Sequence, residues 1–334
     1  MKSNFKRFFL VFVILLLAFF CLASCKEEPE TPNDEPIYYT ATFNFNNGQD
    51  PYTTQFKKGA LIIPPISPER ENYIFNGWKT DGKTWDFSKD MTYSDISFSA
   101  QWIDAASIFD YSTNSNGTIT VTKYRGALTE IRIPEVISGL TVTAIGDEMF
   151  KNFESAGSTV ITVPETVTAI GASAFEGCGT IPVKILGKIS VLGERAFDGC
   201  AKLAEITLAD ELGEIPFRAF AGCSALTEMT LPKNVTKINE DAFWNCASVK
   251  TLVVLSTKLS VDDSAFAGCD GLLTVFYIGS STEWQTVLEG VSDGGNGNDN
   301  FRAAKVYFYS ENEPKGENKS TFWYFNSKGE PRCW

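Results

Sequence analysis

The sequence predicts a mainly β protein: a small β module, then a solenoid of short strands and turns, and an aromatic β segment that caps the C-terminal end. Three observations support this fold class. Residues 38–102 alternate apolar and polar side chains between turns that contain Gly and Asn. Further along, a phenylalanine recurs every 22 or 23 residues, and the residues after 276 are rich in aromatic side chains. With 334 residues, 43% of them hydrophobic, the chain is long enough for two or three packed units.

Residues 1–24 have the pattern of a lipoprotein signal peptide. Basic residues near the N-terminus precede an unbroken apolar run, residues 8–23, which is short for a membrane span of about 20 residues. The tripeptide Leu-Ala-Ser then precedes Cys25. This sequence resembles the lipobox of bacterial lipoproteins, which implies export of the chain and lipidation at Cys25. An ordinary secretory signal and a simple membrane anchor are the alternatives.

Residues 25–37 are expected to form a disordered tether. The segment is charged and rich in proline, with almost nothing to bury, so it stays extended and can hold a folded part away from a bilayer. Several acyl chains, at about 0.8 kcal/mol per buried CH₂, would make a stable anchor. The sequence therefore predicts an exported protein, lipid-anchored to a bacterial membrane and displayed at the cell surface.

The β module predicted for residues 38–102 carries four recognisable motifs, at 42–48, 73–78, 85–87 and 100–102. In these motifs the module resembles the Listeria–Bacteroides repeat, the B-repeat type of internalin-like surface proteins. The resemblance implies a compact β-grasp-like module that serves as a spacer, with no functional residue to carry over. Trp78, Trp85 and Trp102 are expected in its core, and a carbohydrate-binding platform is the alternative.

The motif Ala-Phe-x-x-Cys recurs five times, and its phenylalanines lie 22 or 23 residues apart. A fixed period in this range is typical of a leucine-rich-repeat solenoid. An irregular sixth copy contains Phe150 but lacks the cysteine. We expect the motif residues to stack as a structural ladder, made of Phe175, Cys178, Phe197, Cys200, Phe220, Cys223, Phe243, Cys246, Phe266 and Cys269.

Apolar residues also occupy fixed positions around each phenylalanine, at 14, 12 and 5 residues before it and 6 residues after it. The spacing of two is that of a β-strand, and turns stacked about 4.8 Å apart can bury such residues in continuous rows. Segments such as 226–238 closely resemble the BspA-like leucine-rich repeats of bacterial surface proteins, over residues 117–277. The predicted repeat region, with its N-terminal cap, covers residues 103–275.

The five repeat cysteines share one position, at which leucine-rich repeats bury Asn or Cys. Side chains on stacked turns point in parallel, which favours a row of buried thiols. Adjacent rungs bring such Cα atoms near the distance that a disulfide requires, so disulfides are the alternative. Cys333 is left over, and it is expected to be free or to join another chain.

Residues 276–334 are predicted to form a C-terminal cap, because an open solenoid would expose its core. Aromatic runs at 306–309 and 322–325 predict strands there. The stretch 292–300, rich in Gly, Asn and Asp, is expected to be a flexible, exposed loop. Calcium binding is the alternative for this loop, although it lacks the fixed order and the closing Glu of an EF-hand.

Composition excludes several classes of function. The formal net charge is −12, and an acidic chain repels phosphate backbones, so no nucleic-acid partner is expected. The sequence contains no histidine, which removes the usual general base near neutral pH and the commonest neutral metal ligand. We therefore expect no catalytic residue, no metal, no cofactor and no enzymatic activity.

The expected function is that of a membrane-anchored binding protein, an adhesin or interaction scaffold, for a host or microbial surface protein or glycoprotein. Outward strand positions, 15 and 13 residues before each phenylalanine, offer a candidate binding face on the repeats: Glu205, Thr207, Glu228, Thr230, Thr251, Val253 and Phe276. A plain solvated sheet is the alternative reading of that face. The alternative function is a carbohydrate-binding accessory lipoprotein of the envelope, acting through Trp78, Trp85 or Trp284.

Overall fold

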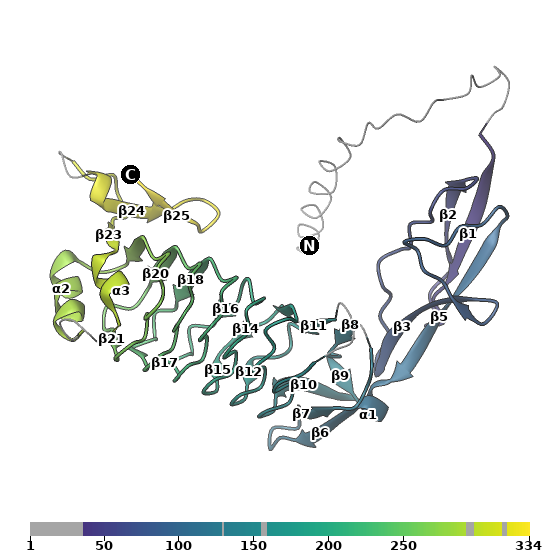
Figure 1. Cartoon of the computed structure of the whole chain (residues 1–334), viewed down its shortest axis with the longest axis horizontal. Coiled ribbons are helices and arrows are strands. Elements are labelled where there is room, and N and C mark those ends of the chain that lie inside the picture. The colour runs from purple at the N-terminus through teal and green to yellow at the C-terminus, as the bar shows by residue number, and fades with distance from the viewer. Residues whose placement is uncertain (1–35, 129, 155–158, 292–296, 316–318) are drawn as a thin grey trace, which may run out of the picture.

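The computed structural model describes residues 36–128, 130–154, 159–291, 297–315 and 319–334 (Figure 1). The predicted signal peptide, most of the predicted tether and Cys25 lie outside these residues. Within the described ranges, no helix is both long enough and apolar enough to cross a membrane.

The first unit is a five-stranded sheet with the order β2-β1-β5-β3-β4. Its strands are β1 (Tyr38–Asn44), β2 (Tyr52–Lys57), β3 (Tyr73–Thr80), β4 (Lys83–Thr84) and β5 (Ile96–Asp104). The first and last strands are parallel at the centre, and their neighbours are antiparallel. This arrangement is β-grasp-like, as the sequence predicts.

Aromatic side chains form the core of this β module. Phe43 and Phe98 are fully buried with their ring centroids 4.9 Å apart, and Trp78 packs edge-on against Phe43, also at 4.9 Å. Trp102 is half-buried, and its Nε1 donates a hydrogen bond to the Phe45 carbonyl at 2.9 Å. The tryptophans therefore stabilise the module mainly by packing.

The module is joined to the solenoid by direct contacts. Ile74 of β3 lies in the main hydrophobic core of the solenoid. The Asn72 side chain accepts a hydrogen bond from the Gly139 backbone N–H at 2.9 Å, between β9 (Val136–Ile137) and β10 (Leu140–Ile145). A short helix, α1 (Ala105–Ile108), then leads into the hairpin of β6 (Phe109–Thr113) and β7 (Ile119–Tyr124).

The repeats stack two rows of short parallel strands along the solenoid. One row contains β8 (Glu130–Arg132), β11 (Val160–Val163), β13 (Val183–Ile185), β14 (Lys188–Ile189), β16 (Thr207–Leu208), β18 (Glu228–Leu231), β20 (Thr251–Val254) and β22 (Thr274–Tyr277). The other contains β10, β12 (Ala169–Ile170), β15 (Val191–Leu192), β17 (Glu214–Ile215), β19 (Lys237–Ile238) and β21 (Ser260–Val261). Equivalent residues of successive rungs pair in register within β8-β11-β13 and within β18-β20-β22, as Met229 does with Leu252. Between these two sheets, β16 pairs with β14, which begins four residues after the equivalent position. The predicted solenoid is confirmed.

A continuous stack of phenylalanine rings runs through the core. Neighbouring ring centroids are 4.8–5.8 Å apart and the planes differ by 1–13°. The seven rings belong to Phe150, Phe175, Phe197, Phe220, Phe243, Phe266 and Phe301. The first six follow from the repeat motif. Phe301 comes from the C-terminal cap, where the motif is absent.

The five repeat cysteines are free and fully buried thiols. Each Sγ donates to the carbonyl of the phenylalanine one rung earlier, at 3.0–3.3 Å. This places a hydrogen-bonded thiol row beside the ring stack, and the disulfide alternative does not apply.

Burial keeps these thiols protonated. It raises the pKa of Cys178 to about 11 and also raises the pKa values of Cys200 and Cys223. A protonated, enclosed thiol reacts poorly because the thiolate is the nucleophile. Cys333, by contrast, is exposed.

We expect a thiol reagent such as DTNB to modify Cys333 alone in the native protein that begins at residue 36. After unfolding in guanidinium, all six cysteines of that chain should react. Mass spectrometry of the labelled peptides measures both states. Rapid native labelling of any repeat cysteine would contradict the buried thiol row.

The C-terminal cap imitates a further rung. It contains α2 (Ser281–Glu289), α3 (Asp299–Ala303) and the strands β23 (Lys305–Tyr309), β24 (Phe322–Phe325) and β25 (Pro331–Cys333). The aromatic strands were predicted, but the two helices were not. Within the repeats, the N–H of Phe220 and of Phe243 donates to an alanine carbonyl of the next rung, at 2.9 and 2.8 Å. For Phe266, the side-chain Oδ1 of Asn298 takes the place of that carbonyl at 2.9 Å.

Asn298 also corrects the prediction of an exposed loop over 292–300. Residues 292–296 lie outside the described residues, but Asn298 is 0% exposed. Its Nδ2 donates to the Asp262 carbonyl at 2.9 Å, so the side chain satisfies backbone groups that the last rung leaves open. Sequence composition indicated only polarity here, whereas the open rung requires a buried amide.

Replacing Asn298 by alanine is expected to lower the free energy of unfolding by about 2–4 kcal/mol, because two buried backbone groups would lose their partners. Urea denaturation followed by circular dichroism measures the change. Asn326→Ala, in the exposed turn before β25, is the control and should cost less than about 1 kcal/mol. Equal effects of the two substitutions would show that Asn298 does not cap the solenoid.

Candidate binding surface

The outward side chains of the row β8 to β22 form one face of the solenoid, called here the outer face. Along these strands the inward residues are buried, among them Met229 and Leu231 of β18. The outward positions Glu205, Thr207, Glu228 and Thr230 are exposed, and Thr251 is half-buried. Thr207, Glu228 and Thr230 stand on strands, and Glu205 lies two residues before β16. On paired strands such as β18 and β20, equivalent outward groups lie about 4.8 Å apart.

Two predicted positions of the binding face differ from expectation. Val253 is only 5% exposed, and Phe276 is half-buried. Val253 pairs with Phe276, whose ring lies 5.5 Å from Trp323 of β24. Trp323 is fully buried, and its Nε1 donates to the Tyr277 carbonyl at 2.9 Å. The prediction that Val253 belongs to the open face is therefore wrong. The antiparallel pair β24 and β25, called here the C-terminal hairpin, covers the outer face at this end.

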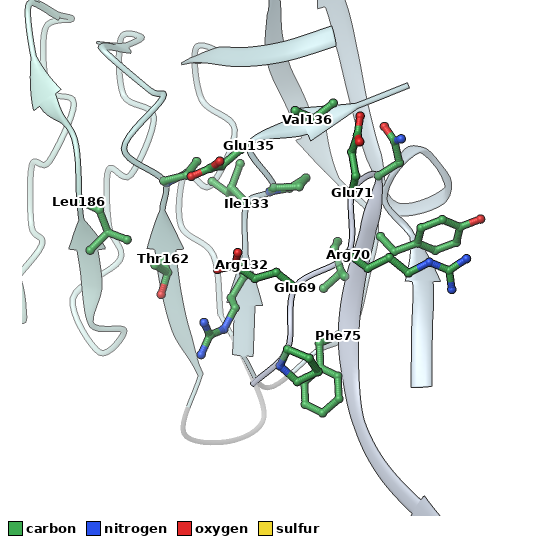
Figure 2. A pocket seen from close by; sticks show the side chains of 16 residues that line it. Glu69, Arg70, Glu71, Phe75, Arg132, Ile133, Glu135, Val136, Thr162 and Leu186 are labelled. Atoms are coloured by element: carbon green, nitrogen blue, oxygen red, sulfur yellow. The ribbon is translucent and has the colours of Figure 1, made fainter. Parts of the chain in front are cut away.

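A pocket lies at the opposite end of the outer face, where the β module meets the first rungs. Its volume is about 340 Å³. Figure 2 shows Glu69, Arg70 and Phe75 of the module on one side and Thr162 and Leu186 of the rungs on the other, with β8 between them. The sequence did not predict this pocket.

The pocket combines an apolar lining with acidic groups at its margin. Leu186, which is 56% exposed, and the half-buried Phe75 contribute the accessible apolar surface, whereas Ile133 and Pro164 also line the pocket but are buried. The acidic residues are Glu69, Glu71 and Glu135, all exposed.

The two pocket arginines already have partners within the described structure. Arg132 pairs with Glu130 at 2.6 Å, and the Arg70 guanidinium lies over the Tyr73 ring, 3.9 Å from its centroid. Among the described residues, no ion pair engages the carboxylates of Glu69, Glu71 or Glu135. Three carboxylates thus stand against the single guanidinium of Arg70, which has no acidic partner in the described part of the chain, so the pocket margin carries net negative charge.

A second set of charged residues has a structural role. Arg218 bonds to Asp198 at 2.8 Å and to Asp241 at 3.1 Å, which links three successive rungs. Arg195 adds a contact to Asp198 at 3.1 Å. The hydrogen bond to Asp198 is the main reason that the pKa of Arg218 is raised. These charges are half-buried and mutually paired, so they brace the turns.

Two of the three tryptophans named for the alternative, carbohydrate-binding function are enclosed. Trp78 is 5% exposed and Trp284 is 3% exposed. Trp284 packs between Tyr277 and Phe301, at 5.0 and 5.3 Å. A sugar ring cannot stack on a tryptophan enclosed in this way. Across the described residues, no group of three or more His, Cys, Asp or Glu side chains is arranged to hold a metal ion.

Parallel strand rows, one phenylalanine per rung and a buried polar row define a leucine-rich-repeat protein. Residues 143–273 match the family described as the BspA type leucine rich repeat region, in six copies. Residues 39–101 match the Listeria-Bacteroides repeat domain. The chain therefore carries both units that the sequence motifs indicated.

Among curated proteins, a putative Gly-rich membrane protein and a putative membrane protein of Evansella cellulosilytica are each 32% identical to this chain over 82 residues. The match covers 24% of this chain and 9% and 12% of theirs, so the chain spans about a tenth of these relatives.

Solved structures similar to this chain are also leucine-rich-repeat proteins. The T. pallidum leucine rich repeat protein is 24% identical, with 57% of this chain and 96% of that chain covered and a TM-score of 0.46. A leucine rich cell surface protein of Faecalibacterium prausnitzii is 16% identical, with 54% and 95% covered and a TM-score of 0.24.

Proposed function

We propose that this chain is an exported lipoprotein, anchored to a bacterial membrane through Cys25, that binds a surface protein or glycoprotein of another cell on its outer face. The observation that carries the proposal is the row of exposed Glu205, Thr207, Glu228 and Thr230 on consecutive rungs. Thr207, Glu228 and Thr230 stand on strands whose opposite sides are fixed in the core, and Glu205 lies two residues before β16.

Rigidity supports a binding role for this face. The strands are held by the phenylalanine stack and the in-register ladders, so the polar groups lose little conformational freedom when a partner binds. Carboxylates and hydroxyls arranged in rows accept hydrogen bonds. The partner surface should therefore present lysine, arginine, amide N–H or sugar hydroxyl groups.

The test of binding uses purified protein beginning at residue 36 and a panel of matrix proteins, mucins and bacterial surface extracts. Glu205→Lys combined with Glu228→Lys should weaken capture of a partner at least about tenfold, because it reverses the charge of the face. Glu289→Lys, on the exposed side of α2, is the matched control. A partner that binds all three proteins equally does not use the outer face.

The test of display uses protease treatment of intact cells with immunodetection of the repeats. Loss of the repeats without lysis is expected, and Cys25→Ala should abolish incorporation of a labelled fatty acid into the protein. Cleavage of the repeats only after lysis would contradict the adhesin proposal. Absence of the fatty-acid label from the unchanged protein, or equal labelling of the Cys25→Ala protein, would exclude lipidation at Cys25.

A further inference from the structure

The pocket between the β module and the first rungs has features that the proposed function does not use. It lies at the open end of the outer face, whereas the C-terminal hairpin closes the other end (Figure 1). A partner lying along the outer face would reach this pocket. We propose that the pocket binds an extended segment of the partner that carries an apolar side chain next to a lysine or arginine. This inference rests on the proposed function.

The volume and the lining of the pocket favour an apolar side chain of the partner segment. A volume of about 340 Å³ is within the range of sites that enclose small ligands, and it exceeds what one large side chain occupies. Leu186 is 56% exposed at the pocket. Covering Leu186 and Phe75 with an aliphatic or aromatic side chain would remove apolar surface from water.

The charge of the pocket margin favours a lysine or arginine beside the apolar side chain of the partner. Glu71 and Glu135 lie at the top of the pocket in Figure 2, on the module and on the segment before β9. Of the two pocket arginines, Arg132 is paired with Glu130, and Arg70, which lies over the uncharged Tyr73 ring, keeps its positive charge. Three carboxylates therefore face one guanidinium that has no acidic partner within the described ranges, and the margin is negative on balance. A lysine or arginine of the partner would supply the counter-charge that Glu69, Glu71 and Glu135 lack, whereas an acidic segment would be repelled.

An edge strand selects the extended conformation. β8 is the last strand of the sheet β13-β11-β8. The Ile133 N–H donates to the Thr162 carbonyl of β11 at 3.0 Å. Backbone groups alternate in direction along a parallel strand, so those of Arg132 turn away from β11, toward the pocket that Arg132 lines. A partner segment in β conformation can pair with them, as in strand addition to a sheet edge.

The experiment measures fluorescence anisotropy of a labelled octapeptide that alternates leucine and lysine, at physiological salt. The comparison peptides alternate leucine with glutamate and serine with lysine. The protein begins at residue 36. The leucine–lysine peptide should bind at least about tenfold more tightly than either comparison, because it alone supplies both features. N-methylation of alternate backbone amides should weaken its binding.

Two variants localise the binding. Leu186→Ser and the pair Glu71→Lys with Glu135→Lys should each reduce affinity for the leucine–lysine peptide about tenfold or more. Leu273→Ser, also at an exposed leucine, and Glu289→Lys are matched controls that should leave affinity unchanged. Thermal denaturation verifies that all variants are folded.

Failure of this inference is distinguishable from failure of the proposed function. Equal binding by site and control variants, or no preference among the peptides, overturns the pocket assignment. In that case loss of partner capture by the Glu205 and Glu228 substitutions would still support the outer face. Peptide binding at the pocket without any surface display would instead remove the adhesin proposal and retain the pocket.

Discussion

Replacing Phe220 by alanine is expected to lower the free energy of unfolding by about 3–5 kcal/mol. The Phe220 ring is fully buried and lies 5.8 Å from Phe197 and 5.4 Å from Phe243. Removing it leaves a cavity in the middle of the stack, and each rung contacts only its neighbours. The substitution should therefore weaken the coupling between the two halves of the solenoid.

Urea denaturation followed by circular dichroism measures this loss, and a broadened or two-step transition would reveal the uncoupling. Phe325→Ala, at a ring 38% exposed on the C-terminal hairpin, removes the same group outside the stack. This substitution should lower the free energy of unfolding clearly less than Phe220→Ala does. Similar losses for the two variants would mean that stability does not depend on the continuity of the stack.

Alkaline pH is expected to destabilise the solenoid more steeply than a protein without buried thiols. The pKa values of Cys178, Cys200 and Cys223 are raised by burial, and that of Cys246 is raised by its hydrogen bond with Cys269 and by burial. The folded chain therefore holds these protons above pH 9.0, the ordinary value, while the unfolded chain releases them. Stability is intact below that pH and falls as the pH rises above it.

Each thiol contributes a slope of about 1.4 kcal/mol per pH unit once the unfolded form is ionised, so four thiols together contribute roughly 5.6 kcal/mol per pH unit. Urea midpoints between pH 8 and pH 10.5, in a reducing buffer, measure the slope. A Cys200→Ala, Cys223→Ala double variant starts less stable but should lose about half of the slope. An unchanged slope would show that other groups, such as lysines in ion pairs, cause the alkaline unfolding.

The repeated part of the fold was predictable because the same requirement recurs in every rung. Phe197 and Cys200 meet the same neighbours as Phe243 and Cys246, so the motif predicts burial for all of them. Glycine or asparagine stands two residues after each phenylalanine of the repeats, a regularity from which no prediction was drawn. These positions, which include Gly199 and Asn245, have positive φ values of 78° and 56°, a conformation that favours those residues.

The ends were less predictable because their structure depends on contacts between distant segments. Val253 has the outward position of a strand, and nothing near it in sequence indicates the hairpin around Trp323. Asn298 and Phe301 complete the last rung from a stretch that resembles a polar loop. The pocket needs Glu71 and Leu186 to be close together, although 115 positions separate them in the sequence.

The way in which Asn298 takes over from an alanine carbonyl has an evolutionary consequence. Every internal junction uses the same backbone bond, and only the final one uses the asparagine. In-frame duplication or deletion of one 23-residue unit would therefore recreate an existing junction and leave the terminal one untouched. Related genes can therefore differ in the number of repeats, and so in the length of the solenoid, while the pocket at one end and the C-terminal hairpin at the other stay the same.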